Sequence, residues 1–233
     1  MHTNDAALVS SNDVVLFGAD TFASLAWFCL THDSPWRVRA FTVDAAYLSN
    51  GSHEGLPVVP FEQLLEHYPP DKVRLLLPLG YHAINGLRRE RYLQAKAMGY
   101  QFISYVSSRA STWPDLQVGE NTLIYEHAII QPFARIGSNV IIRSGTHISH
   151  HCQVADHAFV AAGVTLGGNV RIGEQAFIGL GAILRDGIQI AERTFVGAGA
   201  VVLRDTEADG VYVGNPARKG ERTAQQVTGF QSS

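Results

Sequence analysis

A strict six-residue repeat constrains the fold of this 233-residue chain more than any other feature of its sequence. From position 118 to position 201 the pattern recurs fourteen times without an insertion or a deletion. The first place of each unit is a branched aliphatic: Val118, Ile124, Ile130, Ile136, Ile142, Ile148, Val154, Val160, Leu166, Ile172, Ile178, Leu184, Ile190 and Val196. The fifth place is small or β-branched: Thr122, Ala128, Ala134, Val140, Thr146, Cys152, Ala158, Val164, Val170, Ala176, Ala182, Ile188, Thr194 and Ala200. A fixed short period of this kind predicts a solenoid, in which stacked units bury one continuous core.

Each unit is expected to form one short strand and one bend, and three units close a triangular coil. Coils stack at about 4.8 Å, so the array predicts a prism on the order of 22 Å tall. Gly and Asn tolerate the positive φ angles of tight bends, which are expected at Gly119, Gly137, Asn139, Gly163, Gly167, Gly168, Gly179, Gly181 and Gly187. Outward apolar residues would leave an exposed patch on a single chain, so we expect burial against other subunits for Phe133, Phe159, Phe177, Phe195, Ile129 and Ile183.

The region before the repeat shows alternating strand and helix patterns. Strands are expected at 13–18, 38–43, 73–78 and 100–106, and helices at 20–28, 61–67 and 83–98, the first of them capped by Asp20 or Thr21. This alternation predicts a small parallel sheet covered by helices. The chain is expected to divide into an α/β domain (1–106), a junction (107–117), a β-helix domain with its tail (118–218) and a frayed end (219–233). Thr112 and Leu116 keep the register of the repeat, so one imperfect coil is expected to begin in the junction.

Composition excludes several classes of protein. The chain is 46% hydrophobic and 17% charged, as globular proteins are, and its net charge of −3 without a basic stripe argues against nucleic acid as a partner. Its apolar runs are too short to span a membrane, and residues 1–5 lack the pattern of a signal peptide. Cys29 and Cys152 are expected to be reduced packing residues, which is typical of a cytoplasmic protein.

The repeat resembles the left-handed parallel β-helix of hexapeptide-repeat acyltransferases, and the handedness follows from this resemblance alone. Over about residues 13–218 the chain is similar to the sialic acid O-acetyltransferase-like and bacillosamine N-acetyltransferase-like sugar acyltransferases. Those enzymes join a small Rossmann-like domain to the β-helix, form homotrimers and use acetyl-CoA to acylate a free or nucleotide-linked sugar. The resemblance therefore implies this two-domain fold, a homotrimer, acetyl-CoA as cosubstrate and no metal.

Residues 141–152, which read Ile-Ile-Arg-Ser-Gly-Thr-His-Ile-Ser-His-His-Cys, match the segment that carries the catalytic histidine of the family. The resemblance places that histidine at His150. A sugar amine or hydroxyl must lose a proton as it attacks a thioester, and imidazole is suited to accept it near neutral pH. Backbone amides at coil bends can stabilise the oxyanion.

Two positions depart from the family pattern. Arg143 replaces an asparagine, which suggests an altered acceptor pocket that meets a phosphate or a carboxylate. His151 replaces the acidic residue that orients the catalytic imidazole, and Asp156 or Glu126 is a candidate substitute from another coil.

Other histidines lie in the same region. His147 and His151 are candidate supporting groups, whereas His127 and His157 are more typical of polar edge residues. A γ-class carbonic anhydrase also has a β-helix and binds zinc through three histidines. The histidine spacing does not match that pattern, and that class lacks the N-terminal domain.

The resemblance also implies a groove between neighbouring prisms for acetyl-CoA. Its expected lining is Ala161, Gly168, Gly179, Leu180, Gly197 and Ala198. The tail segment 214–218, Gly-Asn-Pro-Ala-Arg, resembles the G-x-P-A-K/R segment of the family, in which the basic residue lies near the CoA phosphates, so Arg218 is expected there. The alternative is that the small residues serve only the geometry of the coils.

The N-terminal domain departs from its relatives at the nucleotide loop. Relatives carry G-x-x-G-H-G after the first strand, where amides cradle a phosphate. Here only Gly18 matches, and Asp20 is unfavourable beside a diphosphate. Asp44 is a candidate for a ribose hydroxyl or for a turn, and Tyr81 and His82 follow the third strand at the usual ligand edge. This domain is expected either to contact the nucleotide of the acceptor or to be purely structural.

These observations predict an acetyl-CoA-dependent enzyme that acetylates an amino group of a free or nucleotide-linked sugar. The candidate catalytic residues are His150, His151 and His147, and the candidate substrate-binding residues are Gly18, Asp44 and Arg143. No covalent acyl-enzyme is expected, because the register points Cys152 inward. Sugar O-acetylation, a non-catalytic β-helix assembly module and a γ-class carbonic anhydrase-like metalloenzyme are the alternatives. The presence of His150 together with the 214–218 segment favours the enzyme.

Overall fold

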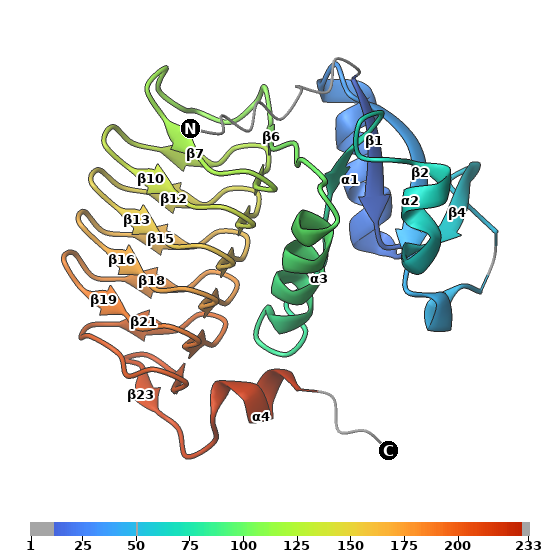
Figure 1. Ribbon diagram of the computed structural model, residues 1–233. Coiled ribbons are helices and arrows are strands. Elements are labelled where there is room, and N and C mark those ends of the chain that lie inside the picture. Colours follow the sequence, from blue (N-terminus) through green and yellow to red (C-terminus); the bar gives the residue numbers. More distant parts are fainter. Residues whose placement is uncertain (1–11, 50, 230–233) are drawn as a thin grey trace, which may run out of the picture. The chain divides into compact units, whose positions relative to one another are not determined.

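The computed structural model describes residues 12–49 and 51–229 (Figure 1), so residues 1–5, considered above for a signal peptide, lie outside the described residues. The chain forms two compact units. One contains the residues up to 79 together with 92–103, and the other contains 80–91 together with the residues from 104 onward. In the described residues no helix is long and apolar enough to cross a membrane.

The first unit is an α/β domain built on a five-stranded sheet in the order β3-β4-β2-β1-β5. Its strands are β1 (Asp13–Phe17), β2 (Arg37–Val43), β3 (Ser52–His53), β4 (Leu56–Pro60) and β5 (Arg74–Leu76). Its helices are α1 (Thr21–Asp33), η1 (Ala45–Tyr47), η2 (Phe61–Gln63), α2 (Leu64–His67) and part of α3 (Gly86–Ala97). All pairs are parallel except the β3–β4 hairpin. Val14, Val15 and Leu16 on the central strand are fully buried, as expected where helices cover both faces of a sheet. The predicted Rossmann-like domain is confirmed.

Two predictions for this region were wrong. Residues 100–106 do not form a fourth strand of the sheet, because Phe102 makes a single bridge to Leu75 and the segment Tyr105–Val106 (β6) pairs within the β-helix. The helix expected from residue 83 begins only at Gly86, because residues 83–85 have positive φ angles. The Asn85 side chain instead donates hydrogen bonds to two carbonyls of the β-helix.

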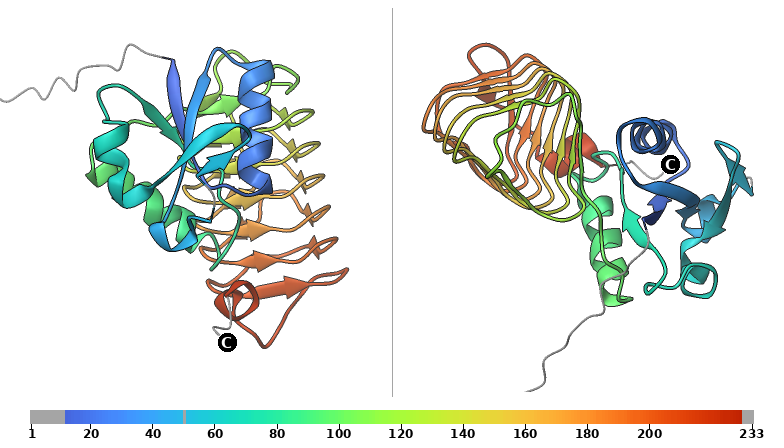
Figure 2. Two further views of the ribbon diagram at one scale, coloured as in Figure 1. Left: turned by 90° about the vertical axis from the view of Figure 1, so that its right-hand side faces the viewer. Right: turned by 90° about the horizontal axis from the view of Figure 1, so that it is seen from above.

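The second unit is a left-handed parallel β-helix whose successive coils superpose when seen from above (Figure 2). The first face contains β6, β8 (Leu123–Ile124), β11 (Ile141–Ile142), β14 (Phe159–Val160), β17 (Phe177–Ile178), β20 (Phe195–Val196), β22 (Val211–Val213) and β23 (Arg218–Lys219). The second face contains β9 (Ile129–Ile130), β12 (His147–Ile148), β15 (Thr165–Leu166), β18 (Ile183–Leu184) and β21 (Val201–Val202). The third face contains β7 (Gln117–Val118), β10 (Arg135–Ile136), β13 (Gln153–Val154), β16 (Arg171–Ile172) and β19 (Gln189–Ile190).

The inward ladders follow the register that the sequence predicts. All fourteen fifth-place residues are buried, and so are the first-place residues except Val118, which is half-buried. Cys152 is fully buried, and its thiol donates to the Gly167 carbonyl at 3.1 Å. The imperfect coil expected in the junction is present. It starts with β6, continues through a bridge between Ser111 and Ile129, and ends with β7.

The bends follow a simpler rule than the glycine pattern indicated. Every fourth-place residue has a positive φ angle: Asn121, His127, Phe133, Asn139, Gly145, His151, His157, Gly163, Asn169, Gln175, Gly181, Gly187, Arg193 and Gly199. The prediction of positive φ was therefore wrong for Gly119, Gly137, Gly167, Gly168 and Gly179. Glycine is needed at these positions for close packing and not for a positive φ angle. At Gly119, for example, a Cβ would lie 2.5 Å from the backbone of the next coil, so close stacking of coils requires the glycine.

The outward aromatics of the first face are not exposed, contrary to expectation. Phe159 and Phe177 are buried, since the Tyr81 ring contacts both, with centroid distances of 5.6 and 4.4 Å. The Arg88 guanidinium lies 5.8 Å from the Phe159 ring and donates to carbonyls of two coils. Phe195 is half-buried against Phe177. Segment 80–91 of the same chain therefore covers this face.

The tail is more ordered than the frayed end that the sequence suggested. Residues 218–229 include β23 and the helix α4 (Ala224–Thr228). Thr223 caps α4 in a capping box with Gln226, and Ala224 is fully buried.

Candidate active site

A pair of histidines forms the centre of the site, at the corner between the second and third faces. This corner, called corner 2–3, contains residues 131–134, 149–152, 167–170 and 185–188. His150 Nδ1 lies 3.1 Å from His151 Nδ1, so one ring donates the shared proton and the other accepts it. The Phe133 ring packs on His151 at 4.7 Å, and the His150 amide donates to Gln131 Oε1 at 3.0 Å. The backbone and one ring nitrogen of His150 are thus both fixed.

Gly168 packs against the His150 ring. A Cβ at this position would lie 2.6 Å from His150 Cε1 and 2.8 Å from His150 Nε2. The Gly168 amide donates to Asp186 Oδ1 on the next coil at 2.7 Å. Among residues 12–49 and 51–229, His150 Nε2 has no hydrogen-bond partner, and the side chain is exposed. This nitrogen is therefore available to a substrate.

Neither acid that the sequence suggested as a partner for His150 lies at this corner. Asp156 lies at the corner between the third and first faces, where Oδ1 accepts the Ser138 amide at 2.8 Å. Glu126 lies at the corner between the first and second faces, where it accepts the Ser144 hydroxyl at 2.8 Å. Among the residues that the structure describes, His151 is the side chain that lies within hydrogen-bond distance of the His150 ring.

The corner between the first and second faces, called corner 1–2, carries a second polar group. The Arg143 guanidinium lies 4.5 Å from the centre of the buried Tyr125 ring. Partial burial acts to raise the pKa of Glu126, but the Ser144 hydroxyl and the Arg109 and Arg143 guanidiniums outweigh it and bring this pKa below its ordinary value. The carboxylate is therefore ionised at neutral pH.

The predicted acetyl-CoA residues fall into two groups in one chain. Ala161, Gly179, Leu180, Gly197 and Ala198 continue corner 1–2 on later coils, whereas Gly168 lies with His150 at corner 2–3. The tail residue Arg218, on β23, is exposed and lines a depression of 530 Å³ with Arg204 and Lys219.

The other histidines are not part of the pair. His147 lies on β12, half-buried on the second face, and in the described residues it has no hydrogen bond to His150. His157 is buried in a ladder of side chains, with Nδ1 2.8 Å from Asn139 Nδ2, and burial lowers its pKa to about 4. His127 is an exposed bend residue with a φ angle of 60°.

The α/β unit uses its predicted ligand edge for contacts within the chain. Gly18 has a φ angle of 114°, and its amide donates to Thr42. Asp20 Oδ1 accepts hydrogen bonds from the backbone amides of Phe22 and Ala23, each at 3.0 Å. These amides in the first turn of α1 therefore already have an acceptor. Asp44 follows β2 at the start of η1.

The sequence reasoning missed a polar depression beside His151. It has a volume of 470 Å³ and is lined by Phe133, Arg135, His151, Gln153, Asn169 and Arg171. Its arginines occupy sixth places of the repeat on the third face. The signal was present as arginines 36 residues apart, which the 18-residue coil places on one face. Among the described residues no group of three or more His, Cys, Asp or Glu side chains is arranged to hold a metal.

Comparison with known proteins agrees with this architecture. The bacterial transferase hexapeptide family (six repeats) matches residues 115–150 and 133–168. The structure of PerB from Caulobacter crescentus, in complex with CoA and GDP-perosamine, has a TM-score of 0.81 and 26% identity, over 89% of this chain and 97% of that one. Variants of that perosamine N-acetyltransferase in which one histidine is replaced have also been solved.

Two further structures share the fold. The acetyltransferase domain of PglB from Neisseria gonorrhoeae has a TM-score of 0.79 and 24% identity, over 90% of this chain and all of that one. WeeI from Acinetobacter baumannii has a TM-score of 0.67 and 24% identity, over 88% of this chain and 98% of that one. No curated protein matches the sequence significantly. The chain thus carries the hexapeptide repeat of bacterial transferases, and over about nine-tenths of its length its fold is the one seen in these acetyltransferase structures.

Proposed function

We propose that the protein is an acetyl-CoA-dependent sugar N-acetyltransferase with His150 as general base. The observation that carries this proposal is the fixed position of the His150 ring. The ring lies against Gly168, its Nδ1 atom is 3.1 Å from His151 Nδ1, and its Nε2 atom has no hydrogen-bond partner among the described residues. The likeness to a perosamine N-acetyltransferase solved with CoA and a nucleotide-linked amino sugar supports the reaction class and the acceptor class.

In the proposed reaction the neutral amine of the acceptor attacks the carbonyl carbon of the thioester. His150 Nε2 accepts one proton from that nitrogen while Nδ1–H donates to His151 Nδ1. The carbon–sulfur bond then breaks, and the leaving thiolate takes the proton from the His150 imidazolium. The products are the N-acetyl sugar and CoA. Cys152 takes no part, since it is buried and burial raises the pKa of its thiol.

A homotrimer is part of the proposal, and three of the six outward residues expected to favour it, Ile129, Phe133 and Ile183, are exposed. Large apolar residues are exposed on the second face and at its two corners: Ile129, Phe133, Leu180, Ile183 and Leu203. Exposed apolar residues gathered in this way favour self-association. Because corners 1–2 and 2–3 both border this face, packing it around a threefold axis would bring His150 of one copy to the small residues of the next.

The test is release of CoA thiol by the purified full chain with a panel of nucleotide-linked amino sugars. His150→Ala is expected to lower kcat/KM by about 10²–10⁴-fold, the contribution of a positioned base. His67→Ala, at an exposed residue of the α/β unit, is the matched control and is expected to change little. Wild-type rates in His150→Ala would refute the assignment.

Identification of the product separates N- from O-acetylation. An amide product survives mild alkali, whereas an ester is hydrolysed. Turnover of an acceptor that has a hydroxyl in place of the amine would identify the enzyme as an O-acetyltransferase.

A further inference from the structure

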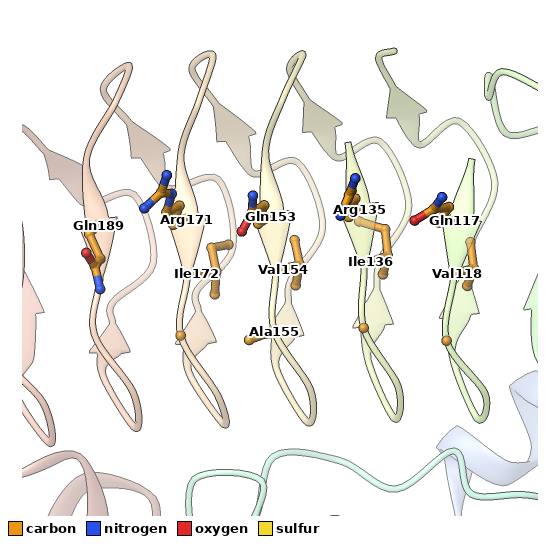
Figure 3. A pocket seen from close by; sticks show the side chains of 13 residues that line it. Gln117, Val118, Arg135, Ile136, Gln153, Val154, Ala155, Arg171, Ile172 and Gln189 are labelled. Carbon is orange, nitrogen blue, oxygen red and sulfur yellow. The ribbon is translucent and has the colours of Figure 1, made fainter. Parts of the chain in front are cut away.

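The third face of the β-helix differs from the other two in its outward residues. Its sixth places hold Gln117, Arg135, Gln153, Arg171 and Gln189, one per coil and paired in register (Figure 3). We call these five residues the Gln–Arg stripe. The equivalent places are apolar on the first face and mostly apolar on the second. The third face alone is polar at every coil.

The charges of the stripe are not balanced on this face. Opposite charges on neighbouring strands stabilise a sheet, whereas like charges directly opposite each other destabilise it. Here glutamines separate the two arginines, which places Arg135 and Arg171 two strands, or about 10 Å, apart. Among the described residues neither arginine makes an ion pair, and both are exposed. The stripe therefore presents two positive charges with a neutral amide between them.

The stripe continues into the candidate active site. The five residues line a groove of 510 Å³. Arg135, Gln153 and Arg171 also line the 470 Å³ depression that contains His151. A ligand on the central part of the stripe would thus lie directly beside the ring that contacts His150.

The geometry selects a particular ligand chemistry. Guanidinium groups match phosphate oxygens with paired hydrogen bonds, and the Gln153 amide can donate between them. Two long cationic side chains that flank one amide suit an extended group with two negative charges better than a single carboxylate. In the α/β unit Asp20 already occupies the first amides of α1, the place where a phosphate would otherwise bind.

We propose that the Gln–Arg stripe binds the diphosphate group of a substrate beside the His150–His151 pair. Both substrates of the proposed function contain such a group, namely acetyl-CoA and a nucleotide-linked sugar. The naming of these two substrates as the source of the diphosphate rests on the proposed function. Diphosphate binding by the stripe does not, because it can be measured without turnover.

The test is calorimetric titration of the full chain with CoA in one arm and with UDP and GDP in the other. The variant is Arg135→Gln/Arg171→Gln, which extends the glutamines already present on the face and so preserves the fold. The control is Lys72→Gln/Arg222→Gln, which removes two exposed cations elsewhere. Pantetheine, which lacks the diphosphate, is titrated as a further control ligand.

The stripe variant is expected to weaken binding of one ligand class at least tenfold, with pantetheine binding and the control variant unchanged. Weakening in the CoA arm identifies the CoA diphosphate, and weakening in the nucleotide arm identifies the diphosphate of the nucleotide-linked acceptor. Unchanged affinities in both arms would overturn the proposal, as would an equal loss in the control. A changed oligomeric state of the stripe variant in sedimentation would overturn it too, since the face would then be an interface between copies. Failure of the wild type to bind CoA would instead count against the proposed function.

Discussion

Replacing Gly168 by alanine tests whether the position of the His150 ring, and not only its presence, determines activity. A Cβ at residue 168 would lie 2.6 Å from His150 Cε1, whereas carbon atoms in ordinary contact are about 3.5–4.0 Å apart. The ring must therefore retreat by about 1 Å. Such a movement would lengthen the 3.1 Å contact between the two Nδ1 atoms beyond hydrogen-bond distance.

Stability is expected to change little in this variant. Gly168 does not have a positive φ angle, so alanine fits its backbone. The clash is with the exposed ring of His150, which can swing outward without disturbing the aliphatic core. A misplacement of about 1 Å can cost 10²-fold in rate, so we expect kcat/KM to fall by about 100-fold, or about 2.7 kcal/mol of transition-state stabilisation.

The assay is the initial rate of thiol release at varied acetyl-CoA, with thermal melts of the same samples. Gly51→Ala is the matched control, because its Cβ would meet nothing within 4 Å. The loss is expected in kcat. A rise in KM for acetyl-CoA with kcat unchanged would show instead that Gly168 serves cosubstrate binding. A Gly168→Ala enzyme with wild-type kcat/KM would refute the reasoning.

Three further predictions concern assembly and stability. Ile183→Glu places a charge on the apolar second face and is expected to convert the proposed trimer to monomers in analytical ultracentrifugation; an unchanged mass would place the interface elsewhere. His127→Gly relieves a left-handed φ angle of 60° and is expected to raise the free energy of unfolding by about 1 kcal/mol in urea titrations. Burial lowers the pKa of His157 to about 4, so the unfolded chain binds a proton first as pH falls below 6.5. Stability should fall by on the order of 2–3 kcal/mol between pH 6.5 and 4, and His157→Asn should remove this part of the pH dependence.

The repeat made the β-helix predictable in detail because one rule applies to every coil. The place of a residue in the six-residue unit determines whether its side chain points inward. The register of the repeat therefore predicts the burial of Cys152 and the exposure of His150. The first face was misjudged because its covering segment, 80–91, has no repeat signal of its own. Arg88 looked like one charged helix residue among several, yet it is fully buried on the carbonyls of two coils.

The site was predictable only in part. The position of His150 came from the resemblance, but its partner depends on the rotamer of His151, which spacing does not determine. The polar depression beside the pair also escaped prediction, although Arg135 and Arg171 are 36 residues apart and so occupy equivalent places two coils apart. Each arginine is unremarkable by itself, and the arrangement has meaning only once the 18-residue coil is used to align them.

His151 is one of nine fourth-place residues other than glycine that have a positive φ angle, so its side chain, and not its backbone, distinguishes it. Its φ angle of 59° lies in the left-handed region, where residues other than glycine lose roughly 1–2 kcal/mol. Gly187 occupies the equivalent position two coils later at corner 2–3, so the geometry of this corner does not require a bulky residue. The inward ladders above and below fix the bend, which allows the strained residue to persist. A histidine in this place, 3.1 Å from the His150 ring, is the arrangement expected if the second imidazole positions the first.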